Sequence, residues 1–256
     1  MISLTIWQII LMKYSPQYIL IVVLTLVLSH FSASAKDYLV SVGINDYSSF
    51  PSKLGNLMLP INDAKSLTNL YANHGDVDYA LLLDKDATKH RIIAAMKKVF
   101  TNSTDTDRII FFFSGHGYAG GVCAYDGKLT YDEIKKVFAS MSSSAKIIFV
   151  DACRAGGIRV KQKNSSHPKG VSSDVIFFLA SRTNESSIER IDMKNGFFTE
   201  YLVRGLKGNA DENKDRAITT KELYEFVSKR VGIQSRDLQH PVMWGNFNDS
   251  TIIMNW

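Results

Sequence analysis

Two side chains suited to nucleophilic catalysis each follow an apolar stretch of this sequence. His116 comes after Arg108–Phe113, and Cys153 comes shortly after Lys146–Val150. If both stretches are parallel strands of one sheet, their carboxyl ends lie at the same edge, where an imidazole and a thiol could meet. A thiolate is a strong nucleophile, and a nearby imidazole can take the thiol proton. The pattern therefore predicts Cys153 as a nucleophile and His116 as its base.

Backbone groups beside these two side chains could stabilise the charge that develops during nucleophilic attack. Gly115 and Gly117 flank His116 and would let a substrate backbone approach closely. Backbone N–H groups in such turns can hold an oxyanion, and we predict those of Gly117 and Cys153 in this role. A lone Cys or His at a strand end is usually structural, so the prediction rests on their occurring together.

Alternating strand-like and helix-like patterns could position this pair. Apolar strand-like runs cover Tyr38–Ile44, Tyr79–Leu83, Arg108–Phe113, Lys146–Val150 and Val175–Ala180. Helical periodicity covers Asn62–Asn73, Thr88–Phe100, Tyr131–Met141, Phe198–Leu206 and Thr220–Val231. The alternation predicts an α/β fold, with a mostly parallel β-sheet flanked by helices on both faces.

Composition narrows the class of protein. The chain has 256 residues, 45% of them hydrophobic, which suits one soluble α/β domain with a sizeable core. The formal net charge is +5, but the basic residues are scattered and are not interleaved with aromatic residues. Nucleic-acid binding is therefore not expected.

Residues 1–35 are expected to direct export rather than to form part of the fold. Tyr18–Leu28 is almost wholly apolar, Lys13 precedes it, and a run of small residues follows it. This order is typical of a secretory signal peptide, with Met12 as a candidate true start. The alternative is an uncleaved membrane anchor, for which the apolar run is short. We therefore expect residues 36–256 to be the exported domain, periplasmic or secreted, without stable membrane association.

Cys123 and Cys153 differ in their sequence settings. A disulfide is the ordinary expectation for two cysteines in an exported chain, but a thiol in a disulfide cannot attack a substrate. Cys153 follows a buried-strand pattern, whereas Cys123 lies in a short glycine-containing segment. We expect two thiols, with a reversible inactivating bridge as the alternative.

The two reactive motifs resemble those of the caspase-like cysteine peptidases, most closely the metacaspase-type branch. Ser114-Gly115-His116-Gly117 is similar to the histidine motif of that family, and Asp151-Ala152-Cys153 is similar to its cysteine motif. Caspases typically have Gln where this chain has Asp151, and their histidine lies about 50 residues upstream. Weaker similarities extend the resemblance over nearly all of residues 36–256, at Val42–Tyr47, Asn62–Ala64, Ala180-Ser181 and Asn195–Thr199. The resemblance implies a cysteine endopeptidase that is monomeric and needs no organic cofactor.

The resemblance also implies a preference among substrates. In the metacaspase-type branch, the positions matching Asp63, Ser114 and Asp151 line an acidic pocket. Such a pocket would select a peptide or protein substrate with Lys or Arg before the scissile bond. The residues themselves leave an alternative open for each carboxylate. Asp63 could be a helix N-terminal residue stabilised by the helix dipole, and Asp151 could cap backbone N–H groups at a strand end.

The segment directly after Cys153, residues 154–174, is rich in Gly, Ser, Lys and Arg and is predicted to be a long exposed loop. If specificity is basic, this loop is a candidate self-cleavage site, with cationic residues at Arg159, Lys161, Lys163 and Lys169. The alternative is a solvated, variable loop.

Residues 211–222 have the spacing of a calcium-binding loop. Oxygen-bearing side chains stand at its liganding positions, namely Asp211, Asn213, Asp215, Thr219 and Glu222. The position that is ordinarily glycine is Arg216, whose bulk and charge oppose the required turn and a cation. We therefore favour a helix–turn–helix connector in which Thr219 or Thr220 caps the next helix, with Glu222 nearby. Calcium is a candidate cofactor, although the predicted chemistry does not require it.

Two other functions are compatible with these patterns. One is a catalytically silent interaction domain that keeps the caspase-like fold, against which the intact Cys–His pair argues. The other is a cysteine hydrolase that acts on amides other than peptides.

Overall fold

The computed structural model describes residues 35–51, 54–143, 145–153, 175–182, 193–245 and 248–256. The predicted signal peptide and the predicted self-cleavage loop therefore lie outside the described residues, apart from Ala35. Among the described residues, no helix is both long enough and apolar enough to span a bilayer.

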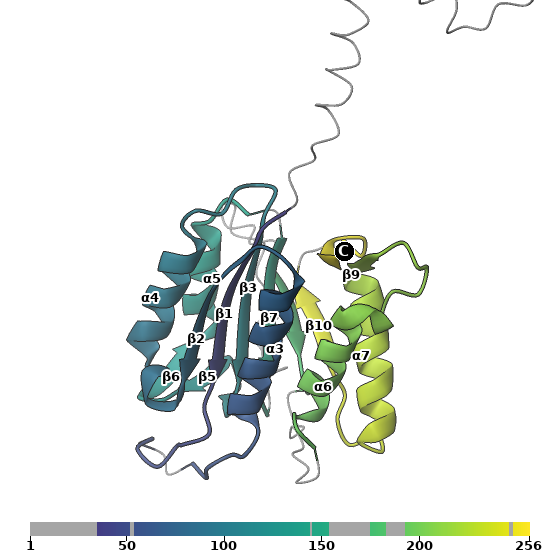
Figure 1. The fold of residues 1–256 in the computed structure, drawn as a ribbon. Coiled ribbons are helices and arrows are strands. Elements are labelled where there is room, and N and C mark those ends of the chain that lie inside the picture. Colours follow the sequence, from purple (N-terminus) through teal and green to yellow (C-terminus); the bar gives the residue numbers. More distant parts are fainter. Residues whose placement is uncertain (1–34, 52–53, 144, 154–174, 183–192, 246–247) are drawn as a thin grey trace, which may run out of the picture. The chain divides into compact units, whose positions relative to one another are not determined.

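A six-stranded sheet forms the centre of the domain, in the order β10-β8-β7-β3-β1-β2 (Figure 1). Its strands are β1 (Asp37–Gly43), β2 (Val77–Leu83), β3 (Arg108–Ser114), β7 (Ala145–Asp151), β8 (Val175–Leu179) and β10 (Val242–Gly245). All neighbouring pairs are parallel except β10 with β8, which is antiparallel. The five predicted strands and the mostly parallel sheet are confirmed, whereas β10 was not predicted.

Helices cover both faces of this sheet (Figure 1). One face carries α4 (Lys89–Phe100) and α5 (Tyr131–Ala139), and the other carries α3 (Pro60–His74), α6 (Phe197–Arg204) and α7 (Thr220–Gln234). A π-helical turn, η3 (Gly205–Asn209), continues α6, and a short 3₁₀ turn, η1 (Asp84–Asp86), follows β2. All five predicted helices are confirmed, with boundaries that shift by a few residues.

Alternation along the central strands divides the core into two layers. Val40 and Phe111 belong to the cluster beneath α4, and their neighbours Leu39 and Phe112 belong to the cluster beneath α3. Successive side chains of a strand point to opposite faces, so a strand covered on both faces is apolar throughout. This explains why the central strands are continuous apolar runs in the sequence.

Two small sheets complete the domain. The first contains β4 (Gly117–Tyr118), β5 (Gly121–Ala124) and β6 (Gly127–Thr130), in that order. The second pairs β9 (Ala217–Thr219) with β11 (Ile252–Asn255). These short strands were not predicted, and the first set carries the backbone directly after His116.

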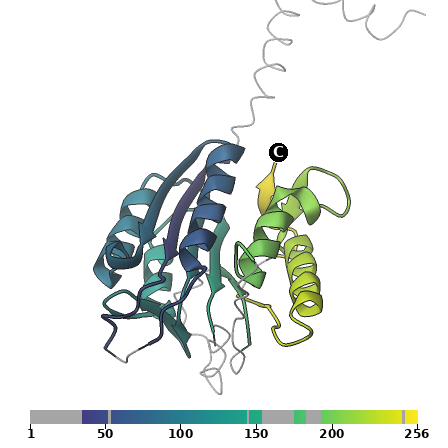
Figure 2. The same cartoon turned by 60° about the horizontal axis from the view of Figure 1, so that its bottom comes forward.

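The register of the parallel strands brings three strand ends to one edge of the sheet. Gly43 of β1 lies opposite Ser114 of β3, which in turn lies opposite Asp151 of β7. This carboxyl edge is at the lower end of the domain in Figure 1 and comes forward in Figure 2. Ligand sites of open α/β sheets lie outside such an edge.

A buried ion pair joins β1 and β3 at the opposite edge. The Arg108 guanidinium donates to both carboxylate oxygens of Asp37, at 2.5 and 3.1 Å, and both residues are less than one-tenth exposed. It also donates to the Asn255 side-chain oxygen at 2.8 Å. This contact attaches the last strand to the central sheet.

Candidate active site

His116 lies just beyond β3, and its ring is oriented by a backbone carbonyl. Its Nε2 is 2.7 Å from the carbonyl oxygen of Gly55. A carbonyl oxygen only accepts hydrogen bonds, so Nε2 carries a proton in this contact. In the neutral imidazole, Nδ1 is then the unprotonated nitrogen. Gly55 thus favours the tautomer in which Nδ1 can act as a base.

Tyr47 holds the backbone of His116. Its hydroxyl accepts the His116 N–H at 2.9 Å and donates to the Cys123 carbonyl at 3.1 Å. The Cys123 N–H donates to the His116 carbonyl at 2.9 Å, so the hydroxyl stands where the second hydrogen bond of a strand pair would be. The two rings pack edge to face with centroids 4.6 Å apart. Burial raises the pKa of Tyr47, so the hydroxyl stays protonated and can make both contacts.

Gly117 packs directly against the turn that carries Cys153. A Cβ atom at Gly117 would lie 2.5 Å from the Cys153 carbonyl oxygen and 3.0 Å from the Ala152 Cβ, so only glycine fits. The Gly115 N–H also donates to the Asp151 carbonyl at 3.1 Å. These backbone contacts bring the His116 and Cys153 segments together, as the two apolar runs predicted.

The N–H of Gly117 is turned away from the neighbouring strand. Gly117 lies opposite Val122 in the β4–β5 pair, next to the hydrogen-bonded position formed by His116 and Cys123. Positions alternate along an antiparallel pair, so the Gly117 N–H does not face β5. Its predicted role as an oxyanion donor is compatible with this orientation.

All five predicted catalytic and pocket side chains line one small pocket at the carboxyl edge. The pocket has a volume of about 30 Å³ and is lined by Leu57, Pro60, Asp63, Ser114, Gly115, His116, Asp151, Cys153 and Gly196. This volume is far below the roughly 300 Å³ or more that is typical of ligand-binding sites. A Lys or Arg side chain would therefore require the pocket to widen.

The two carboxylates of this pocket bind the start of α6. Asp63 accepts hydrogen bonds from the Ser114 hydroxyl at 2.8 Å and the Gly196 N–H at 3.0 Å. Asp151 accepts hydrogen bonds from the Thr199 hydroxyl at 2.8 Å and its N–H at 3.2 Å. Asp63 is 2% exposed and Asp151 is 5% exposed. The N-terminus of a helix favours negative charge, which suits two carboxylates at this position.

Both interpretations of these carboxylates thus have a structural basis, because Asp63 lies in the first turn of α3, Asp151 accepts a backbone N–H at the end of β7, and both line the pocket. Gly196 makes this arrangement fit. A Cβ atom there would lie 2.8 Å from the Asp151 carboxylate and 3.5 Å from that of Asp63. Sequence reasoning missed the roles of Tyr47, Gly55, Gly196 and Thr199. Three of these four lie in segments that resemble the caspase-like family, but the resemblance gave them no role.

A family model described as the caspase domain matches residues 38–251. The chain belongs to the caspase-domain family. This is a family of cysteine peptidases, which implies a peptide or protein substrate. No match was found among curated protein sequences.

Solved structures show the same caspase fold. A protein from Geobacter sulfurreducens is 20% identical, with a TM-score of 0.61, over 83% of this chain and 94% of that chain. Caspase-1 from Spodoptera frugiperda is 12% identical, with a TM-score of 0.63, over 86% of this chain and 90% of that chain. At these identities the likeness concerns the fold.

The two cysteines of this caspase domain have different environments. Cys153 is partly exposed in the pocket, whereas Cys123 is buried in β5, and the two form no disulfide. Burial raises the pKa of the Cys123 thiol to about 11. Cys123 is therefore protonated and a poor nucleophile at neutral pH.

The candidate calcium loop, residues 211–222, contains the helix cap that was expected of a connector. The Thr219 hydroxyl accepts the Glu222 N–H at 3.3 Å, and the Glu222 carboxylate accepts the Thr219 N–H at 3.0 Å, which is a capping box at the start of α7. The Asp211 carboxylate accepts the N–H groups of Asp215 at 3.2 Å and Arg216 at 3.1 Å. Throughout the described residues, no three His, Cys, Asp or Glu side chains are placed to hold a metal ion.

One expectation about this loop is wrong. Arg216 was expected to resist the turn normally made by glycine, yet its φ is 67°, within the left-handed region. The carboxylate of Asp211 compensates by accepting its N–H. A charged residue thus makes the turn because local hydrogen bonds offset its strain.

Proposed function

We propose that this caspase-domain protein is an exported cysteine endopeptidase that cleaves after Lys or Arg. The observation that supports this proposal is that His116, Cys153 and the two buried carboxylates of Asp63 and Asp151 all line the same pocket. A nucleophile, a base and two anionic groups beside one another suit hydrolysis of a bond next to a cationic side chain.

In this proposal, the Cys153 thiol transfers its proton to Nδ1 of His116 and the sulfur attacks the carbonyl carbon of the scissile bond. The negative charge on the carbonyl oxygen is stabilised by the N–H groups of Gly117 and Cys153. The C–N bond then breaks, the leaving amine takes the proton from His116, and a thioester to Cys153 remains. Water, deprotonated by His116, hydrolyses the thioester and restores the thiol.

Asp63, Asp151 and Ser114 would bind the substrate cation. An ionised carboxylate has about four acceptor positions, so the hydrogen bonds to α6 leave capacity for a Lys or Arg side chain. Charge-assisted hydrogen bonds in a buried setting are strong, which would give the basic preference.

The remaining parts of the proposal rest on the sequence. Residues 1–35 would direct export, and the cationic segment 154–174 would be a site of self-cleavage. The side chains of the 211–222 loop accept N–H groups of their own turn, and Glu222 belongs to the capping box of α7, so no step is derived through calcium.

The test is covalent labelling with a thiol-reactive probe that carries Lys or Arg at the recognition position. We expect labelling of the wild type and its loss in Cys153→Ala and in His116→Ala. Cys123→Ala is the matched control and should label like the wild type. Absence of labelling in the wild type would instead favour a silent domain, and labelling that persists in Cys153→Ala would refute the assigned nucleophile.

A further inference from the structure

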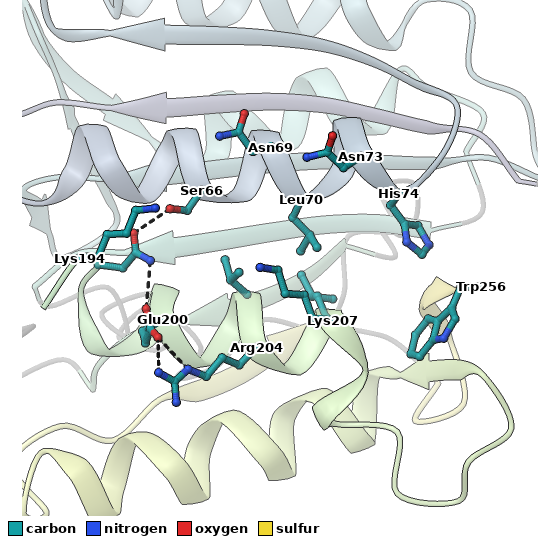
Figure 3. Close-up of a pocket in the computed structure, with 13 residues that line it drawn as sticks. Ser66, Asn69, Leu70, Asn73, His74, Lys194, Glu200, Arg204, Lys207 and Trp256 are labelled. Atoms are coloured by element: carbon teal, nitrogen blue, oxygen red, sulfur yellow. Dashed lines mark hydrogen bonds and ion pairs between the residues drawn. The ribbon is translucent and has the colours of Figure 1, made fainter.

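A second and larger cavity lies between α3 and α6 (Figure 3). Its volume is about 750 Å³, within the range typical of ligand-binding sites. Ser66 and Lys194 lie at one end, and His74 and Trp256 lie at the other (Figure 3). The proposed peptidase chemistry does not use this cavity.

The lining of this cavity carries an excess of positive charge. Three cations, Lys194, Arg204 and Lys207, line it with a single carboxylate, Glu200. Arg204 donates to the Glu200 carboxylate at 2.7 Å and offsets its charge. Among the described residues, Lys194 and Lys207 form no ion pair. Two ammonium groups therefore remain to attract an anionic ligand.

The two lysines are separated by the length of α6. Lys194 precedes this helix and Lys207 follows it, and eight helical residues rise about 12 Å. This backbone separation exceeds the size of a single phosphate or carboxylate group. An extended peptide gains about 3.3 Å per residue, so a segment of about four residues would reach from one lysine to the other.

The opposite wall offers groups that suit a peptide backbone. Asn69 and Asn73 are exposed, lie one turn apart on α3, and line the cavity (Figure 3). Side-chain amides both donate and accept, which matches the C=O and N–H groups of an extended peptide. Leu70, which is partly exposed, supplies apolar surface between the two walls, with the buried Val203 and Leu206 beside it.

The cavity also shares a wall with the proposed active site. Asn195 lines the cavity, and the next residue, Gly196, lines the catalytic pocket. The Asn195 side chain accepts from the Ser66 hydroxyl at 2.9 Å and donates to Glu200 at 3.1 Å, so it joins α3 to α6. A ligand that contacts Asn195 would therefore be one residue along the chain from Gly196, which packs against the Asp63 and Asp151 carboxylates.

We propose that the α3–α6 cavity is a second binding site, which takes an extended acidic peptide segment. Its carboxylates pair with Lys194 and Lys207, its main chain pairs with Asn69 and Asn73, and an apolar side chain packs on Leu70. Such a site would recognise a substrate or regulatory protein at a distance from the scissile bond. It goes beyond the proposed function and does not depend on peptidase activity.

The experiment measures binding directly, by fluorescence anisotropy, to the full chain carrying Cys153→Ala. The probe is a short labelled peptide of Asp, Glu and Leu, without Lys or Arg, so that it offers no basic side chain to the catalytic pocket. We expect the Lys194→Glu/Lys207→Glu double variant to bind about tenfold more weakly, since each exposed pair contributes up to about 1 kcal/mol. Lys98→Glu, on α4 at the other face of the sheet, is the matched control and should bind normally.

Several results would overturn the proposal. These are no binding of the acidic probe, equal binding of its Asn/Gln/Leu analogue, or unchanged binding by the double variant. Tighter binding of inorganic phosphate or a small dicarboxylate at the same lysines would replace it with a small-anion site. If the double variant unfolds, Lys207→Gln alone provides the test, because it removes one charge without introducing another. Failure of binding leaves the labelling of Cys153 unaffected, so the two proposals are tested separately.

Discussion

At the scale of single residues, the tautomer and the position of the His116 ring depend on groups outside the predicted catalytic pair. The Gly55 carbonyl favours a proton on Nε2, and the Tyr47 hydroxyl fixes the backbone from which the ring extends. Neither group would touch the substrate in the proposed mechanism. Both determine where the unprotonated Nδ1 lies.

Tyr47→Phe should therefore reduce turnover without changing the substrate preference. Loss of the hydroxyl leaves the His116 N–H and the Cys123 carbonyl without their bridge, which costs about 1–2 kcal/mol of stability. Misplacement of the base should lower kcat by about tenfold or more, with KM nearly unchanged. Tyr38→Phe removes a hydroxyl that bonds Asn102 and is the control, for which kcat should stay normal. A KM effect without a kcat effect would contradict a positioning role for Tyr47.

Asp63→Asn tests the basic pocket. The amide keeps the size of the side chain but removes a buried charge, so kcat/KM for a substrate with Arg should fall by about thirtyfold or more. For a substrate with the neutral isostere citrulline, kcat/KM should fall much less. Paired measurement of the two substrates separates lost recognition from lost structure. An equal fall in kcat/KM for both substrates would mean that Asp63 holds the start of α6 and does not bind the substrate cation.

The two thiols should differ in reactivity with pH. Burial raises the pKa of Cys123 to about 11, so native protein at neutral pH should take up one alkyl group from iodoacetamide, at Cys153. Peptide mass mapping after brief alkylation gives the site. Cys153→Ala should stay unmodified until the pH approaches the pKa of Cys123 or the chain unfolds. Rapid modification of Cys123 at neutral pH would show that β5 opens readily.

At the scale of elements, sequence patterns predicted the long helices and the buried parallel strands. Each of these has enough residues to show a period or an unbroken apolar run. The strands β4, β5 and β6 have two to four residues and show neither. Their pairing depends on long-range contacts, such as the Tyr47 hydroxyl between His116 and Cys123. This limit also explains why the sequence predicted a candidate nucleophile, base and carboxylates, while the groups that hold them in place were missed.

The start of α7 gives a prediction at this scale. Thr219→Ala removes the hydroxyl of the capping box and should lower the free energy of unfolding by about 1 kcal/mol. Thr219→Ser retains the hydroxyl and should lower the free energy of unfolding much less. Chemical denaturation with calcium and with chelator measures both variants. If the loop is a connector, the loss should be the same in both buffers, and a loss seen only with calcium would restore a metal site.

At the scale of the whole domain, the two ends of the parallel strands carry different features. The carboxyl ends carry the candidate catalytic pocket, and the amino ends carry the ion pair of Asp37 with Arg108, which also contacts Asn255. Because the pair is buried, removing one partner leaves an uncompensated charge.

Asp37→Asn should accordingly lower the free energy of unfolding by about 3 kcal/mol. Asp78→Asn is a suitable control, since that carboxylate is mostly exposed beside Lys36 and its loss should cost less than about 1 kcal/mol. Denaturant titration of both variants gives the comparison. Similar small losses would mean that the Arg108–Asn255 contact alone fixes this edge.

The hydrogen bonds from Gly196 and Thr199 to the pocket carboxylates also constrain how specificity could evolve in this lineage. Under the proposed function, a neutral residue at Asp63 or Asp151 would change the preferred substrate and loosen the first turn of α6 in the same step. Evolution of a different cleavage preference would therefore pass through less stable protein variants, or begin with substitutions that stabilise the start of α6 by other contacts. Homologous chains with a neutral pocket should accordingly differ at positions 196 and 199 as well, as a linked set of changes.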